Sequence, residues 1–131
     1  MGAVLLDSTV LIDVLSGRPK TSARFVALQA TGDVPHVCAV TAEEVSAYLK
    51  PREREAAGAM FEGLSVAPLG IAEGRLAGWL RREFRRRGKT LSQADALIAA
   101  AAVGISARLA TGNPKDFPMP NLVVDHWPVG E

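Results

Sequence analysis

Four short segments each place a carboxylate where an apolar strand or a loop gives way to a helix. In the first, the strand-like run Val4–Leu6 is followed at once by Asp7 and by the helix-starting pair Ser8-Thr9. In an open α/β sheet the carboxyl ends of the strands form the crevice where ligands bind. An acid at that place is either a helix cap or part of the floor of a site. The other three segments are Thr41–Glu44, Ser92–Asp95 and Asn113–Asp116.

Strand-like and helical patterns alternate along the chain, which is typical of a parallel sheet covered by helices on both faces. We therefore expect a three-layer α/β/α domain, spanning residues 1–131, with a small parallel sheet of about four to five strands. The predicted strands are Val4–Leu6, His36–Val40, Ser65–Leu69, Arg108–Thr111 and Leu122–Val124. The predicted helices are Ser8–Ser16, Thr21–Thr31, Thr41–Leu49, Arg52–Gly63, Ile71–Arg87 and Ser92–Val103, with a single turn at Asn113–Phe117.

Composition excludes several classes of protein. A net charge of +1 does not indicate a general nucleic-acid binder, so any basic surface must be local. The one cysteine, Cys38, cannot form an internal disulfide, which fits a reducing compartment. No basic leader precedes an apolar run, and no stretch approaches the ~18 uncharged apolar residues of a membrane span. We expect a cytoplasmic protein without membrane association.

Ordinary helix capping is one interpretation of the four acids. Thr41 with Glu44, and Ser92 with Asp95, match the capping box. Asn113, followed by Pro114 and then Asp116, is another helix start. A carboxylate near a helix N-terminus is stabilising by about 0.3–1 kcal/mol through the helix dipole alone.

A metal site is the other interpretation, and it rests on the four acids taken together. If the strands before them are parallel neighbours, Asp7, Glu44 and Asp116 share one edge of the sheet, and Asp95 opens an apolar helix that should be buried. Gathered like charges repel and need neutralising, and Mg²⁺ or Mn²⁺ prefers such oxygen ligands. Metal-activated water would then suit hydrolysis of a phosphodiester. His36, His126 and Cys38 do not make a zinc site, and no P-loop, G-x-S-x-G or G-x-G-x-x-G motif is present.

The blocks VLLDSTVLIDVLSG, VTAEEVSAYL, LSQADALIAAAAVG and LATGNPKDF occur in an order and spacing that resemble a PIN domain. The resemblance is greatest to a VapC-type toxin of a bacterial toxin–antitoxin pair and covers essentially the whole chain. It implies an endoribonuclease that depends on one or two Mg²⁺ or Mn²⁺ ions and cuts transfer or ribosomal RNA. It also implies a homodimer that is neutralised by a VapB-type antitoxin.

By that resemblance Asp7, Glu44, Asp95 and Asp116 correspond to the family's acidic metal-binding quartet. Asn113 is an alternative to Asp116 as the residue that reaches the metal or its water. Thr9 or Ser8 could hydrogen-bond Asp7 or substrate phosphate, with an N-cap role as the alternative. The further acid Asp13 lies nearly two turns into the first helix, where a structural or surface role is favoured.

Six basic residues gather near the end of one predicted helix: Arg81, Arg82, Arg85, Arg86, Arg87 and Lys89. They are either a solvated helix end or contacts for RNA phosphates, with Arg85 and Arg86 as candidates. Trp79 and Phe84 stand at helical spacing, where a core role is favoured over a groove for a second copy or an antitoxin.

Two rival functions remain. One is a catalytically silent PIN-like module that binds RNA or protein. The other is a phosphotransfer receiver, which the lack of an acid at the end of the third predicted strand, in Ala67–Gly70, disfavours.

Overall fold

The computed structural model describes residues 2–131. Five strands form one sheet: β1 (Ala3–Leu6), β2 (Val34–Val37), β3 (Ser65–Val66), β4 (Arg108–Thr111) and β5 (Val124–His126). The helices are α1 (Ser8–Leu15), α2 (Pro19–Ala30), α3 (Ala39–Tyr48), α4 (Arg54–Glu62), α5 (Ile71–Arg86) and α6 (Gln93–Gly104). Two short 3₁₀ turns, η1 (Pro51–Glu53) and η2 (Pro114–Asp116), complete the described chain.

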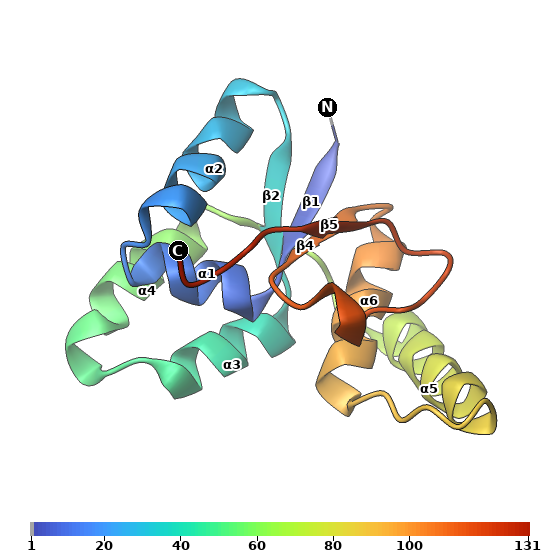
Figure 1. The fold of residues 1–131 in the computed structure, drawn as a ribbon. Coiled ribbons are helices and arrows are strands. Elements are labelled where there is room, and N and C mark those ends of the chain that lie inside the picture. Colours follow the sequence, from blue (N-terminus) through green and yellow to red (C-terminus); the bar gives the residue numbers. More distant parts are fainter. Residues whose placement is uncertain (1) are drawn as a thin grey trace.

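The sheet is parallel throughout, in the order β3-β2-β1-β4-β5. β1 is therefore the central strand, paired with β2 on one side and β4 on the other. Because all strands run the same way, their carboxyl ends share one edge, just below which α1 and α3 begin in the view of Figure 1. The expected parallel sheet of four to five strands is confirmed.

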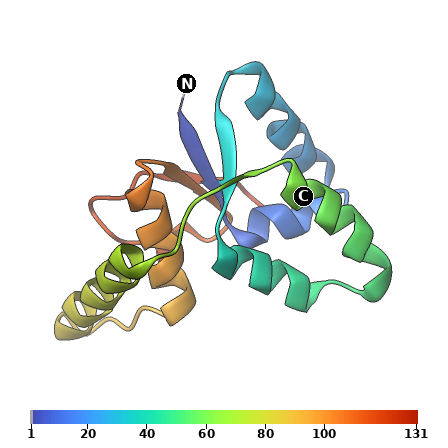
Figure 2. The ribbon, with the colours of Figure 1, turned by 180° about the vertical axis from the view of Figure 1, so that it is seen from behind.

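Helices cover both faces of the sheet and create two cores. Helices α1, α2 and α4 lie on one side and α5 and α6 on the other, in both views (Figures 1 and 2). Val4 and Leu6 of β1 point into the first core, and Leu5 points into the second, because alternate side chains of a strand face opposite ways. The three-layer α/β/α architecture is thus the observed one. Among residues 2–131 no helix is long and apolar enough to cross a membrane.

Two predicted elements are displaced around β2. The predicted strand His36–Val40 is observed as Val34–Val37, and α3 begins at Ala39 with Cys38 at its N-cap. Pro35 is tolerated in the strand because it lies before the point where β3 begins to pair with β2. Consequently Thr41 lies inside the helix and the predicted Thr41–Glu44 capping box is wrong. The Thr41 side chain is fully buried, with its hydroxyl 3.6 Å from the Cys38 sulfur.

The remaining differences are at element ends. The predicted Ser65–Leu69 strand has only the two residues of β3. The last strand begins at Val124, because the Leu122 N–H donates to the Met119 carbonyl in a turn. α1 ends one residue earlier than predicted and α2 begins two residues earlier, with Pro19 in its first turn. The predicted helix Arg52–Gly63 divides into η1 and α4, and the other helices agree within one residue.

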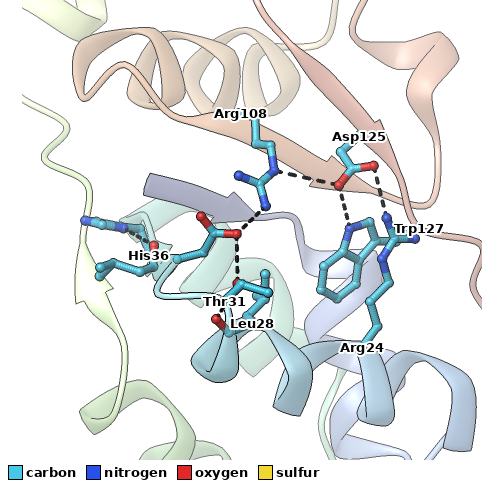
Figure 3. A network of polar contacts seen from close by, with 9 residues as sticks. Arg24, Leu28, Thr31, His36, Arg108, Asp125 and Trp127 are labelled. Carbon is cyan, nitrogen blue, oxygen red and sulfur yellow. Dashed lines mark hydrogen bonds and ion pairs between the residues drawn. The ribbon is translucent and has the colours of Figure 1, made fainter. Parts of the chain in front are cut away.

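A polar network ties α2 to β4 and β5 (Figure 3). Arg24 bonds Asp125 at 3.1 Å and lies over the Trp127 ring, and Arg108 bonds Asp33 at 2.9 Å. The Arg108 guanidinium lowers the pKa of Asp33 to about 2. The network fixes β4 and β5 against α2.

Candidate active site at the carboxyl edge of the sheet

Asp7 lies at the centre of this edge, directly after β1. Its side chain is 4% exposed and caps α1, with Oδ1 accepting from the Ser8 backbone N–H at 2.7 Å. Oδ2 accepts from two hydroxyls, Thr9 at 3.1 Å and Thr111 at 2.7 Å. The prediction that Thr9 or Ser8 bonds Asp7 is therefore confirmed, while the N-cap is Asp7 itself. The Ser8 hydroxyl also donates to Oδ1, at 3.4 Å, and together these donors fix the carboxylate in one orientation.

Glu44 comes from α3 and is partly buried beside Asp7. Burial raises the pKa of Glu44, and the negative charges of Asp7 and Asp95 add to that effect, while a hydrogen bond with Ser8 opposes it. Its Oε1 atom is buried and has no hydrogen-bond partner within residues 2–131. The adjacent acid Glu43 is exposed, so Glu44 is the acid of this pair that lies at the edge.

Asp95 comes from the first turn of α6. Its backbone N–H donates to the Ser92 side chain at 3.0 Å, so Ser92 is the N-cap that the sequence predicted. Burial raises the pKa of the Asp95 carboxyl, the Ser92 hydrogen bond lowers it, and the charges of Asp116 and Asp7 raise it further. The helix behind it is buried as expected, through Ala96 and the run 98–102.

Asp116 and Asn113 lie at either end of the η2 turn after β4, and both side chains are exposed. Pro114 opens the turn as predicted, but Asn113 makes no side-chain capping bond. Asp116 is close enough to raise the pKa of Asp95. Four elements thus bring the four predicted acids to one edge.

The four carboxylates carry uncompensated charge. None of them is ion-paired to a cationic side chain in the part of the chain that the structure describes. The same residues, 2–131, contain no three acidic, histidine or cysteine side chains already in a metal-ligating arrangement. Like charges repel, so a tighter arrangement requires a cation between them. An all-oxygen donor set with an orphaned carboxylate oxygen on Glu44 fits a hard divalent ion.

The loop after the basic end of α5 contacts the turn that carries Asp116. Arg85 and Arg86 are exposed, and Arg86 and Arg87 both pair with Glu83, at 3.0 and 3.2 Å. Just beyond the helix, the Lys89 ammonium donates to the Lys115 carbonyl at 3.5 Å, in the turn that carries Asp116. Lys89 therefore lies next to the acidic edge, and Arg85 and Arg86 are exposed on the helix that precedes it.

Three other predicted residues separate into different environments. Phe84 is in the core, as expected, but Trp79 is 59% exposed and stacks with Arg75, so the core prediction for Trp79 is wrong. Helical spacing shows which residues share a helix face but not whether a neighbouring element covers that face. Because α5 lies at the outside of the fold (Figure 1), part of its apolar face stays uncovered. Asp13 is buried and hydrogen-bonded, which agrees with a structural role.

Sequence analysis missed Thr111 and Gly112, the two residues after Ala110 of β4. The Thr111 hydroxyl is fully buried, donates to Asp7 and accepts from the Asn113 backbone N–H at 3.0 Å. Gly112 donates its backbone N–H to Thr9 at 3.0 Å. A polar Thr at the end of an apolar strand, followed by Gly, is the sequence pattern that could have indicated them.

Comparisons with known proteins identify the family of this chain. The PIN domain family profile matches residues 4–118. Ribonuclease VapC10 of Mycobacterium tuberculosis is 32% identical over 117 residues, covering 88% of this chain and 86% of the relative. Ribonuclease VapC19 of the same organism is 29% identical over 115 residues, covering 88% and 92%.

The fold itself matches solved structures. A chain in the crystal structure of VapBC2 from Rickettsia felis bound to a promoter DNA fragment superposes with a TM-score of 0.80 at 22% identity, covering 95% of this chain and 98% of that chain. The chain therefore belongs to the PIN-domain family and is of the VapC type.

Proposed function

We propose that this protein is a metal-dependent endoribonuclease, the toxin of a VapBC-type toxin–antitoxin pair. The observation that carries the proposal is the buried Oε1 of Glu44, which lacks a hydrogen-bond partner within residues 2–131, beside other carboxylates that raise its pKa. A buried acceptor without a donor costs about 1–3 kcal/mol. A bound cation would remove that cost, and the names of the relatives make RNA the substrate class to test.

In this proposal Asp7, Glu44, Asp95 and Asp116 hold one or two Mg²⁺ or Mn²⁺ ions. A bound divalent ion supplies a more acidic water and neutralises charge on the phosphate. Asp7 is held by donors from Ser8, Thr9 and Thr111, so its carboxylate is oriented before any ligand arrives. Asn113 stays the alternative to Asp116 for the outermost ligand, because both are exposed on the same turn.

The basic end of α5 would hold the RNA. Lys89 lies beside the turn of Asp116, and the exposed Arg85 and Arg86 at the end of α5 would neutralise phosphates farther along the strand. Phosphate contacts position a strand without reading its sequence. Transfer or ribosomal RNA is the proposed substrate.

The proposed protein partners are a VapB-type antitoxin and a second copy of the chain. The similar Rickettsia felis structure is a VapBC complex, which supports the antitoxin. A cationic antitoxin segment would match the unpaired acids of the carboxyl edge. The exposed Trp79–Arg75 pair is a candidate surface for either partner. Unchanged oligomeric state and antitoxin binding in Trp79→Ala would refute that surface.

The test is cleavage of total transfer and ribosomal RNA by purified protein with Mg²⁺, with Mn²⁺ and with EDTA. We expect discrete fragments that disappear with EDTA and in Asp7→Asn and Glu44→Gln. The matched control is Glu43→Gln, which removes an exposed acid one residue away and should leave cleavage intact. Absence of both cleavage and Mn²⁺ binding up to millimolar concentrations, measured by calorimetry on the folded wild type, would refute the proposal and favour a silent binding module.

A further inference from the structure

The segment Trp127–Gly130, which follows β5, crosses the site-bearing end of the fold to α1 (Figure 1). Trp127 is 2% exposed, and its backbone N–H donates to the Thr111 carbonyl at 2.9 Å. The Pro128 carbonyl lies 3.5 Å from the Thr21 hydroxyl of α2. The segment is therefore fixed to β4 at its first residue and lies against α2 at its second.

Asp13 fixes the other end of this segment. Its Oδ2 accepts from the Gly130 backbone N–H at 2.9 Å and from the Thr21 hydroxyl at 2.8 Å. The Asp13 side chain is only 7% exposed, so these two donors compensate a carboxylate that has little water. Gly130 has φ +82°, a conformation that favours glycine, and in it the N–H reaches Asp13.

Val129, held between these two anchors, packs against Gly112 of the loop after β4. A Cβ placed on Gly112 would lie 2.8 Å from both γ carbons of Val129 and 3.3 Å from the Thr9 hydroxyl oxygen. Gly112 is not among the described glycines with positive φ, which are Gly17, Gly32, Gly88 and Gly130. Lack of space, rather than backbone conformation, therefore excludes a side chain at position 112.

Gly112 is one hydrogen bond away from the donors of Asp7. Its N–H donates to the Thr9 hydroxyl at 3.0 Å, and that hydroxyl donates to Asp7 Oδ2 at 3.1 Å. The next residue, Asn113, begins the turn that ends at Asp116. Val129 thus packs against Gly112, which connects Thr111, a donor to Asp7, to the turn that carries Asn113 and Asp116.

We propose that Val129 is a positioning residue of the active site, and that Asp13 holds it there by anchoring Gly130. The contact between Val129 and Gly112 sets the position of the loop 112–116 and, through Thr9, the orientation of Asp7. This inference rests on the proposed function for its catalytic consequence. The contact itself does not depend on that function.

A size exchange between the two positions tests the proposal. Gly112→Ala adds a methyl group into the γ carbons of Val129, and we expect kcat for RNA cleavage to fall roughly 10- to 100-fold, because small misplacements cost that much. The double variant Gly112→Ala/Val129→Ala removes the clashing carbons and should recover to within a few-fold of wild type. KM for RNA should change less than kcat in every variant. Val123→Ala, at a 68% exposed position in the preceding segment, is the matched control.

Amide signals in nuclear magnetic resonance spectra provide a readout besides activity. Val129→Ala and Asp13→Asn should each shift the signals of Gly112 and Asn113, while Val123→Ala should not. A double variant no more active than Gly112→Ala, or unmoved loop signals in Val129→Ala, would overturn the inference. If the wild type neither cuts RNA nor binds Mn²⁺, the proposed function fails, and the loop signals alone then decide whether Val129 positions the loop.

Discussion

The buried hydroxyl of Thr111 provides the sharpest single test of how the acidic edge is built. Thr111→Val keeps the shape of the side chain and removes both hydrogen bonds of the hydroxyl. One of these is the 2.7 Å donation to Asp7 Oδ2, and the other is the 3.0 Å acceptance from the Asn113 N–H. Thr111→Ser, which keeps the hydroxyl, is the matched variant.

The expected cost follows from these two bonds. A hydrogen bond to a charged group contributes about 1.5–3 kcal/mol and a neutral one about 0.5–1.5 kcal/mol. Asp7 keeps its donors from Ser8 and Thr9, so we expect the lower part of the summed range, about 2–3 kcal/mol of unfolding free energy. For a domain of this size that corresponds to a fall in Tm of about 8–12 °C.

The assay combines denaturant unfolding of the metal-free protein with RNA cleavage in Mn²⁺. Thr111→Val should lower the unfolding free energy by the amount given above. Its kcat should fall at least about tenfold, because Asp7 is no longer fully oriented. Thr111→Ser should lie near wild type in cleavage. Equal stability and activity of the Val and Ser variants would refute the role assigned to the hydroxyl.

Two further predictions concern the charges around the site. Burial and the neighbouring acids raise the pKa of Glu44 in the folded protein, so the folded state binds more protons and the unfolding free energy falls as pH rises through that raised pKa. Glu44→Gln should therefore stabilise the metal-free protein at pH 7, by about 0.5–2 kcal/mol, and by less near pH 4. Arg85→Ala/Arg86→Ala should raise KM for RNA. It should also make the plot of the logarithm of the RNA-binding constant against the logarithm of salt concentration less steep by about 1.4, because each of two lost phosphate contacts contributes ~0.7.

Controls separate these effects from general damage. Glu43→Gln should not reproduce the pH-dependent gain, since Glu43 is exposed. Arg52→Ala, in the exposed η1 turn, should leave the salt dependence of RNA binding unchanged. A destabilised Glu44→Gln at pH 7, or an unchanged salt slope in the Arg85/Arg86 variant, would contradict the respective prediction.

The pattern of apolar residues and helix caps predicted most strands and helices, because these elements depend on residues close to one another in the sequence. The strand Arg108–Thr111 was predicted residue for residue, and α5 and α6 agree within one residue, since apolar periodicity and nearby caps define them. The predicted strand started too late because Pro35 suggested a loop. Proline is acceptable at position 35 because β3 pairs with β2 only from His36 onward. That displacement is also what removed Thr41 from the cap position.

The sequence by itself determined which residue types could form the site: four acids that follow strands or open helices, Asp7 immediately after a buried strand, and a basic helix end. Only the tertiary structure decided how they are held. Thr111 reaches Asp7 across 104 positions of sequence, and Val129 reaches Gly112 across the β4–β5 connection, through contacts that no local pattern encodes. Burial likewise left Trp79 outside the core, because its exposure depends on which neighbouring layer covers that face of α5.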